Sequence, residues 1–330
     1  MTEFIFKTEP YDHQREAFEA SVGISSYALL MDMGTGKTKV DLDTMSSCFE
    51  DGRIDFCLIV APKGVIANWI SEIAAHLPDR VEREVVLWKP ALTKGHREEL
   101  NDLYVETGKL KFLLMNIEAF SSKKGVSVAE IFVNKFKVFM TVDESTTIKN
   151  RQAKRTKAVC RVGRGAVMRR ILTGSPVTKS PMDLYSQMDF LDPAILGFKS
   201  YYAFQGRYAE VQRRSMRSHS FNQIMGYRHL DELTDKLDRN SFRVRKEDCL
   251  DLPDKVYMRR HVELTVEQSD AYAQMGSLAL ARLDSGELAT TQNVLTQIMR
   301  LQQICLGSLT DDDGTVHPLK SNRLSALLDI

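Results

Sequence analysis

The sequence has no long hydrophobic run, few cysteines and no stretch dominated by glycine and proline. None of its apolar segments approaches the roughly 18 residues that a membrane-spanning helix needs. The five cysteines are odd in number, scattered and without a Cys-x-x-Cys pair, which excludes a disulfide framework and a zinc knuckle. With 18 Gly and 9 Pro in 330 residues, disorder over most of the length is excluded as well.

The chain also lacks an excess of charge of either sign. Its 45 Lys and Arg balance 44 Asp and Glu, which gives a formal net charge of +1 and excludes a polybasic tail. The N-terminus has no basic stretch followed by a long apolar core, so we expect no signal peptide. Scattered cysteines and no signal peptide favour a reducing, cytoplasmic location. The length predicts about two domains.

Short apolar runs alternate with helical patterns in the first half of the chain. The runs lie at 27–31, 56–61, 84–88, 111–115, 138–142 and 170–172. Continuous apolar runs of this length are typical of parallel strands that are buried on both faces. Between them, 37–49, 63–77 and 152–162 carry helical patterns. The order predicts an α/β fold with a doubly wound, mostly parallel sheet.

A glycine-rich turn follows the first apolar run and precedes a helical pattern. The turn and the start of the helix read Gly34-Thr35-Gly36-Lys37-Thr38. Backbone N–H groups can approach phosphates closely where Cβ atoms are missing, and a helix N-terminus favours negative charge. Lys37 is then expected to reach the β and γ phosphates, and Thr38 to ligate Mg²⁺. The general phosphate-loop pattern has Gly where this chain has Met31.

Two adjacent carboxylates, Asp143 and Glu144, end the apolar run at 138–142. We expect this run to be a neighbouring strand, so that both carboxylates face the phosphate loop across the carboxyl edge of the sheet. Asp143 is predicted to hold Mg²⁺ through water. Glu144 is predicted to orient and deprotonate the attacking water, with Lys37 and the metal stabilising the transferred phosphoryl group.

With these two motifs in place, the chain resembles the superfamily-two helicase-type ATPases of the Swi/Snf-like group and their phage relatives. The resemblance is carried by segments at 10–14, 29–38, 61–72, 115–119, 143–150, 172–176, 243–255 and 264–268. It implies a RecA-like fold, ATP and Mg²⁺ as cofactors and DNA, more often duplex than single-stranded, as the partner. It also implies the cytoplasm as the location, which for a phage protein is that of the host.

The resemblance assigns roles to further residues. Gln14 of the segment Pro10-Tyr11-Asp12-His13-Gln14 matches a glutamine that contacts adenine. Thr173, Gly174 and Ser175 match a motif that couples hydrolysis to the grip on DNA. The residues expected near the nucleic-acid backbone are Lys63, Asn68 and Asn116.

The chain departs from the family pattern at several points. Thr146 stands where the family has His in the acidic segment, and Thr178-Lys179 stands where it has a Gln-Asn pair. We find no later second-lobe motif, including the arginine-bearing one. We therefore expect a RecA-like core at 1–180, a helical insertion at 181–240, a return to the first lobe at 241–252, and a mostly helical, incomplete start of a second lobe at 253–330. The rest of that lobe is expected in a further C-terminal part or in another chain.

Two basic stretches are hidden by the neutral balance. Residues 145–182 hold ten Lys and Arg, Lys149 and Arg151 among them, and no Asp or Glu. A second stretch, at 199–228, holds six basic residues against Glu210 alone. Such local positive density is typical of phosphate-backbone binding. Solvated helix faces, or contacts with the acidic C-terminal part, are the alternative explanation.

Three hypotheses follow for the function. The first is an ATP-dependent DNA translocase or helicase-like motor. The second is a nucleotide-responsive nucleic-acid-binding module with no turnover of its own, because the arginines that stabilise the transition state are missing. The third is a helicase that acts on RNA.

Overall fold

The computed structural model describes residues 4–91, 93–216, 219–249, 256–284, 291–311 and 313–329. The chain divides into two compact units, Met1–Leu252 and Pro253–Ile330. None of the helices within these described ranges is long and apolar enough to cross a membrane.

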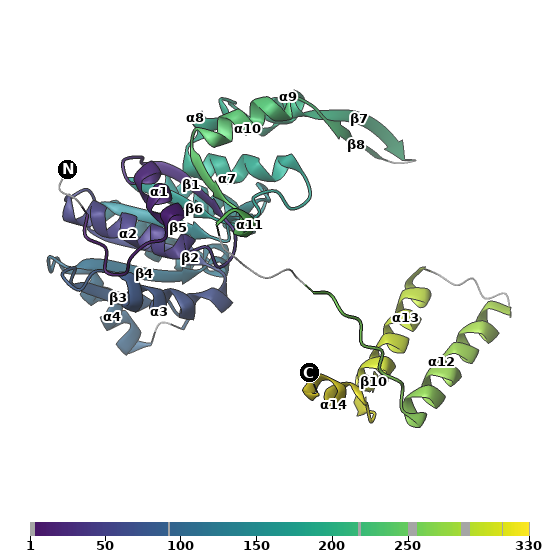
Figure 1. Ribbon diagram of the computed structural model, residues 1–330. Coiled ribbons are helices and arrows are strands. Elements are labelled where there is room, and N and C mark those ends of the chain that lie inside the picture. The colour runs from purple at the N-terminus through teal and green to yellow at the C-terminus, as the bar shows by residue number, and fades with distance from the viewer. Residues whose placement is uncertain are drawn as a thin grey trace. The chain divides into compact units, whose positions relative to one another are not determined.

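A seven-stranded sheet forms the centre of the first unit (Figure 1), and its strand order is β3-β4-β2-β5-β6-β1-β9. Every pair of neighbouring strands is parallel. The strands are β1 (Ser26–Met31), β2 (Phe56–Ala61), β3 (Arg83–Leu87), β4 (Leu110–Asn116), β5 (Val138–Asp143), β6 (Met168–Leu172) and β9 (Ser241–Val244). The predicted doubly wound parallel sheet is confirmed.

Helices cover both faces of the sheet and bury two separate hydrophobic cores. The helices are α1 (Asp12–Ser21), α2 (Lys37–Glu50), α3 (Ile66–His76), α4 (Lys94–Tyr104), α5 (Lys123–Lys135), α6 (Lys154–Gly163) and α7 (Leu184–Leu191). The α1, α2 and α3 helices contribute to one core and the other four to the second. All six side chains of β1, β2 and β5 are buried, as expected of strands covered on both faces.

The segment predicted as a helical insertion at 181–240 is helical only in part. It holds α8 (Pro193–Leu196), α9 (Tyr201–Tyr208) and α10 (Leu230–Asp238), but also an antiparallel hairpin of β7 (Ala209–Met216) and β8 (His219–Tyr227). The prediction was wrong here because most of the hairpin's described side chains are exposed, on both of its faces. Strands without a buried face do not alternate between apolar and polar residues. After α10, β9 returns and pairs with β1.

The second unit contains α12 (Val266–Asp284), α13 (Thr291–Leu306), α14 (Arg323–Leu328) and a small antiparallel pair of strands, β10 (Ser308–Thr310) and β11 (Val316–Pro318). Gln268 of α12 is buried, and its amide donates to the main-chain oxygen of Ile304 in α13, over 2.7 Å. Many large apolar side chains of this unit stay exposed, among them Leu324 and Leu328. Among the side chains that the structure describes in this unit, few are buried.

Candidate nucleotide site

Six of the predicted segments follow the C-terminal ends of strands of the sheet, and the parallel sheet brings these ends to one edge. The phosphate loop follows β1, and Asp143 ends β5. We had predicted that these two strands are direct neighbours. This prediction was wrong, because β6 lies between them. The intervening position is filled by Thr173, directly after β6, so the coupling segment separates the two halves of the site.

The phosphate loop has the backbone conformation that the sequence predicted. Gly34 and Gly36 have φ angles of 82° and 86°, in the left-handed region that favours glycine. Gly36 is the N-cap of α2, and no side chain caps this helix. The backbone N–H groups in the first turn of α2 can therefore donate hydrogen bonds to an anion, and Lys37 and Thr38 lie in that turn. These features fit a nucleotide phosphate.

Gln14 reaches the phosphate loop from α1. Its side-chain nitrogen donates to the main-chain oxygen of Thr35 over 3.1 Å, and the His13 ring nitrogen lies 2.8 Å from the same oxygen. A Cβ on Gly36 would stand 2.2 Å from the Gln14 side-chain nitrogen. Gln14 is buried and packs directly on the turn, so it fixes the loop, and its contact with adenine stays a prediction.

The end of β9 also reaches the loop. The backbone N–H of Lys246 donates to the carboxylate of Asp32 over 3.1 Å. The Lys246 side chain passes over Gly34, with its Nζ 3.5 Å from where a Cβ would stand. A second ammonium group beside the loop was not predicted. Its only signal in the sequence is its place in the segment that resembles the end of the first lobe.

Asp143 is almost fully buried and holds two hydrogen bonds. One carboxylate oxygen accepts from the indole N–H of Trp69 in α3 over 2.9 Å, and the other accepts from the backbone N–H of Glu144 over 2.9 Å. Burial raises the pKa of Asp143, while the Trp69 hydrogen bond and the charge of Lys37 counteract the rise. Carboxylate and hydroxyl oxygens are ligands that Mg²⁺ prefers, so Asp143 and Thr38 fit a magnesium site.

Glu144 has a left-handed backbone, with φ at 50° and ψ at 60°. Such a conformation is unfavourable for residues other than glycine and is concentrated at functional sites. One of its carboxylate oxygens accepts two hydroxyl hydrogen bonds, from Thr146 over 3.0 Å and from Thr173 over 3.3 Å. Thr146 stands where the family has His, so a hydroxyl occupies the place of the imidazole beside the glutamate.

The coupling segment is joined to the acidic segment by a buried amide that the sequence analysis missed. Gln187 of α7 accepts from the hydroxyl of Ser145 over 2.6 Å and donates to the main-chain oxygen of Pro176 over 2.7 Å. Lys149 donates to the hydroxyl of Thr178. A glutamine within an amphipathic helix gives no signal in the sequence, because only the folded chain brings it to these partners.

The residues predicted at the nucleic-acid backbone differ in their surroundings. Lys63 and Asn68, after β2, are exposed at the sheet edge. The Asn116 side chain is already hydrogen-bonded within the protein. Its oxygen accepts from the backbone N–H of Ala119 and so caps the short helix η2 (Ile117–Ser121). Lys149 and Arg151 follow β5 and are half-buried.

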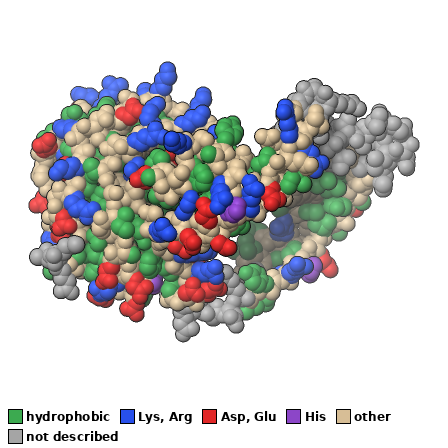
Figure 2. Space-filling view, turned by 90° about the horizontal axis from the view of Figure 1, so that it is seen from above, with side chains coloured by type: hydrophobic (Ala, Val, Ile, Leu, Met, Phe, Trp, Pro, Cys, Tyr) green, Lys and Arg blue, Asp and Glu red, His purple; other side chains and the backbone are tan. Residues whose placement is uncertain are grey.

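The basic residues of the first stretch, at 145–182, lie in different surroundings in the folded protein. Arg170 is fully buried and donates to the main-chain oxygens of Ser21 and Ile24, so it is a core residue. Arg161 pairs with Glu130 over 3.0 Å, and Arg164 lies 3.8 Å from Asp189. On the face in Figure 2, the Lys and Arg side chains form several groups with acidic side chains between them. Arg161, Arg164 and Arg170 are thus engaged within the protein and do not belong to a free cationic surface.

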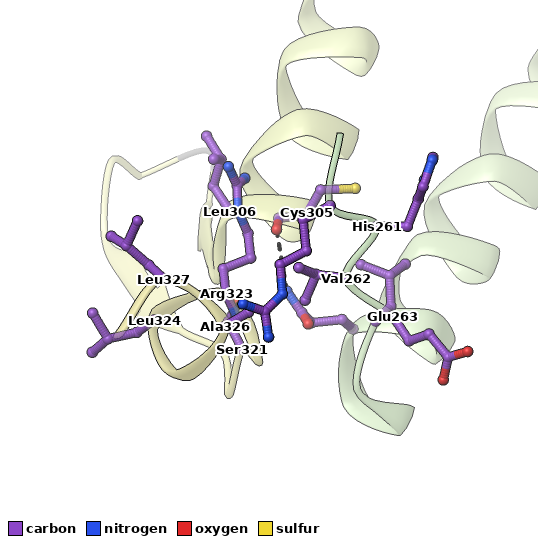
Figure 3. A pocket seen from close by; sticks show the side chains of 13 residues that line it. His261, Val262, Glu263, Cys305, Leu306, Ser321, Arg323, Leu324, Ala326 and Leu327 are labelled. Atoms are coloured by element: carbon purple, nitrogen blue, oxygen red, sulfur yellow. Dashed lines mark hydrogen bonds between the residues drawn. The ribbon is translucent and has the colours of Figure 1, made fainter. Parts of the chain in front are cut away.

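The second unit has an open hollow of about 710 Å³. Its lining is mixed: His261, Glu263 and Arg323 line it together with apolar side chains such as Leu306 and Leu324 (Figure 3). None of the residues predicted for the nucleotide site lies there. The hollow continues the exposed apolar surface of this unit.

The site combines a glycine-rich loop at an uncapped helix N-terminus with an Asp-Glu pair at the same carboxyl edge of a parallel sheet. This combination defines the class of phosphate-loop nucleotide-binding domains. A family model described as the SNF2-related domain matches residues 19–308. The chain belongs to this family, as the resemblance of its motifs had predicted.

The curated relatives are much longer than this chain. An uncharacterized ATP-dependent helicase of Mycoplasma genitalium is 26% identical over 91% of this chain and 26% of its own length. The TATA-binding protein-associated factor MOT1 of Saccharomyces cerevisiae is 26% identical over 83% of this chain and 15% of its own length. The chain thus spans about a quarter or less of these relatives.

Among solved structures, the Sulfolobus solfataricus SWI2/SNF2 ATPase core in complex with dsDNA matches with a TM-score of 0.55 and 22% identity. The match covers 92% of this chain and 60% of that chain. At this level of identity the likeness bears on the fold alone, and it agrees with the predicted RecA-like α/β fold.

Proposed function

We propose that this chain is the N-terminal motor part of an ATP-dependent DNA translocase. The observation that carries the proposal is the position of Glu144. It follows the buried Asp143, lies at the same sheet edge as the phosphate loop, and is hydrogen-bonded to Thr173 of the coupling segment. A base in this position can activate water and transmit the loss of the γ phosphate to a neighbouring strand end.

ATP is the proposed cofactor, with Mg²⁺. The α2 N-terminus, Lys37 and Lys246 would bind the phosphates, and Gln14 would contact the adenine. Thr38 and Asp143 would hold the Mg²⁺, which supplies charge neutralisation when it is bound. Glu144 would accept the proton of the attacking water, and Lys37 would stabilise the charge that develops on the transferred group.

Coupling is proposed to run through hydroxyl groups. Thr173 donates to Glu144, and the backbone N–H of Ser175 donates to the hydroxyl of Thr173 over 3.2 Å. A change at Glu144 thus reaches Ser175 through two hydrogen bonds. Gln187 and Lys149 then connect the coupling segment to the start of the basic stretch at 145–182.

Duplex DNA is the proposed partner. The exposed Lys63 and Asn68 at the same edge support this, as does the solved relative with dsDNA. RNA is the alternative substrate. Comparison of ATP turnover with duplex DNA, single-stranded DNA and RNA separates the possibilities, and preference for duplex DNA is the expected result.

We further propose that Pro253–Ile330 begins a second RecA-like lobe, which further polypeptide completes in the same chain or another. The exposed apolar side chains and the hollow of this unit support the proposal, since they offer a surface for such packing. A cytoplasmic location is also proposed, because all five cysteines are free.

The test is the variant Glu144→Gln, measured in a chain that includes both lobes. Loss of the base is expected to lower the rate of ATP hydrolysis by a factor on the order of 10² to 10⁴ while ATP still binds. The matched control is Glu98→Gln, a change at an exposed glutamate of α4, which is expected to leave the rate unchanged. DNA-dependent hydrolysis by residues 1–330 alone would refute the alternative of a binding module without turnover.

A further inference from the structure

The hairpin β7–β8 is the part of the first unit that the nucleotide site does not use. Figure 1 shows it extending away from α9 and α10 as a two-stranded ribbon. Of its described side chains, most are exposed, including those of Arg213, Arg214, Asn222 and Gln223. An isolated two-stranded ribbon is only marginally stable in water. Its uncovered faces carry these polar side chains beside the exposed apolar Val211 and Met225, and the polar set is suited to a polar partner.

The two arginines lie on opposite faces of the ribbon. Arg213 pairs in register with Asn222 and Arg214 with Phe221, and successive residues of a strand point to opposite faces. Gln212 and Gln223 share the face of Arg214, and Ser215 and Ser220 share that of Arg213. Each face thus carries one guanidinium group accompanied by side chains that donate hydrogen bonds.

The ribbon is positively charged beyond its base, where its one acidic residue, Glu210 of β7, lies. Residues 211–226 contain no Asp or Glu. Among the described residues no ion pair engages Arg213 or Arg214, and the Arg213 guanidinium donates only to the hydroxyl of Ser220, over 3.0 Å. By contrast, Arg207 at the base pairs with Glu232, and Arg228 donates to main-chain oxygens. The arginines at the base serve the fold, whereas those along the ribbon are available.

The base of the ribbon contacts the chain a few residues after the coupling segment. The hydroxyl of Tyr227 in β8 donates to that of Ser180 over 2.9 Å, and Ser180 caps the short helix η4 (Pro181–Asp183). Beside it, the Arg151 guanidinium lies 4.1 Å from the ring centroid of Tyr201 and 5.1 Å from that of Tyr202. Arg151 follows β5, so the base of the ribbon connects to the edge that carries the nucleotide site.

We propose that the hairpin β7–β8 enters a groove of duplex DNA, where Arg213 and Arg214 contact phosphates on its two sides. The major groove of B-DNA admits a two-stranded β-ribbon, and a ribbon with donors on both faces suits it. Arginine is well suited to phosphate because its guanidinium donates two parallel hydrogen bonds. This contact rests on the proposed function, since it assumes that the chain binds duplex DNA.

The experiment measures binding of the chain to a short fluorescent DNA duplex by anisotropy, over about 50 to 200 mM salt. The double variant Arg213→Ala/Arg214→Ala is expected to reduce the slope of log affinity against log salt by about 1.8, since each phosphate contact contributes about 0.9. That corresponds to an affinity up to about 60-fold weaker at 0.1 M salt. The variant Arg213→Lys/Arg214→Lys, which keeps both charges, is expected to retain the slope.

The matched control is Lys94→Ala/Arg97→Ala, which removes two exposed charges of α4 beside β3 at the far edge of the sheet. It is expected to leave the slope unchanged. A slope for Arg213→Ala/Arg214→Ala equal to that of wild type would overturn the ribbon contact and leave the ribbon as a surface for a protein. Wild-type protein that fails to bind the duplex at all would instead contradict the proposed function.

Discussion

The indole N–H of Trp69 donates to the carboxylate of Asp143 over 2.9 Å, and both side chains are buried. The hydrogen bond joins α3 to the end of β5. It counteracts the rise in the pKa of Asp143 that burial causes, and so favours the charged form that a magnesium ion needs. Trp69 is therefore a positioning residue as well as part of the hydrophobic core.

The substitution Trp69→Phe keeps an aromatic ring and removes this donor. A hydrogen bond to a charged group contributes roughly 1.5 to 3 kcal/mol, so we expect Mg²⁺-dependent ATP binding to need about tenfold more Mg²⁺ or more. The deficit is expected to grow as the pH falls, because the pKa of Asp143 rises further. Titration of nucleotide binding with Mg²⁺ at two pH values measures both effects.

Trp88→Phe is the matched control for this substitution. Trp88 is also buried, but its indole nitrogen has no hydrogen-bond partner within the described structure. Its replacement is expected to leave the Mg²⁺ dependence unchanged. An equal shift in both variants would show that loss of packing, and not of the donor to Asp143, is responsible.

Thr173→Val tests the proposed coupling. It removes the hydroxyl that donates to Glu144 and accepts from Ser175. We expect kcat for ATP hydrolysis to fall about tenfold, which corresponds to about 1.4 kcal/mol, with little change in ATP affinity. Thr44→Val is the control, since this buried hydroxyl donates only within its own helix, to Val40. Unaltered turnover in Thr173→Val would contradict the proposal that coupling runs through this hydroxyl group.

Gly36→Ala and Gly52→Ala separate backbone strain from crowding in the phosphate loop. Both glycines have positive φ angles, of 86° and 68°, so each alanine costs about 1 to 2 kcal/mol. A Cβ at Gly36 would also stand 2.2 Å from Gln14, whereas nothing lies within 4 Å at Gly52. ATP binding measured by calorimetry is expected to be lost only in Gly36→Ala. Normal binding in that variant would mean that Gln14 can move away freely.

The stability of the first unit is expected to fall as the pH rises from about 4 to 7. Burial raises the pKa of Asp41 to about 7, although Thr141 donates to it over 2.7 Å. The folded state therefore retains a proton that the unfolded state has released. At about 1.4 kcal/mol per pKa unit, the loss is a few kcal/mol, and Asp43, with its pKa raised to about 6, acts in the same direction.

Asp41→Asn removes the titrating group and is expected to flatten this pH dependence. Urea unfolding at about pH 5 and pH 8, followed by the fluorescence of Trp69 and Trp88, measures the free energy of unfolding of this unit. Asp102→Asn, at an exposed site, is the control. A pH dependence in Asp41→Asn as steep as in wild type would show that Asp41 is not its source.

The sheet, and the positions of the candidate site residues at its edge, could be predicted because the signals for both are local. Runs such as 56–61 and 138–142 are continuous and apolar, since their strands are buried on both faces. The phosphate loop and the Asp143-Glu144 pair directly follow such runs. Parallel strands bring those positions to one edge without further information. The order of the strands, with β6 between β5 and β1, needed the structure.

The contacts that complete the site could not be predicted, because they depend on partners far away in the sequence. Trp69 lies within the helical pattern at 63–77, and nothing local in the sequence indicates that its N–H meets Asp143. The ten cations at 145–182 have no acid among them, but Glu130 and Asp189 approach them in space. Arg170 was counted with this surface and is in fact fully buried.

The central claim is that Lys37 and its loop bind the ATP that drives movement on DNA. Steady-state ATP hydrolysis of a chain with both lobes, with and without duplex DNA, tests it most directly. The account predicts that DNA stimulates hydrolysis by wild-type protein and that Lys37→Ala abolishes the stimulated rate. Equal DNA-stimulated hydrolysis in wild type and Lys37→Ala would contradict it.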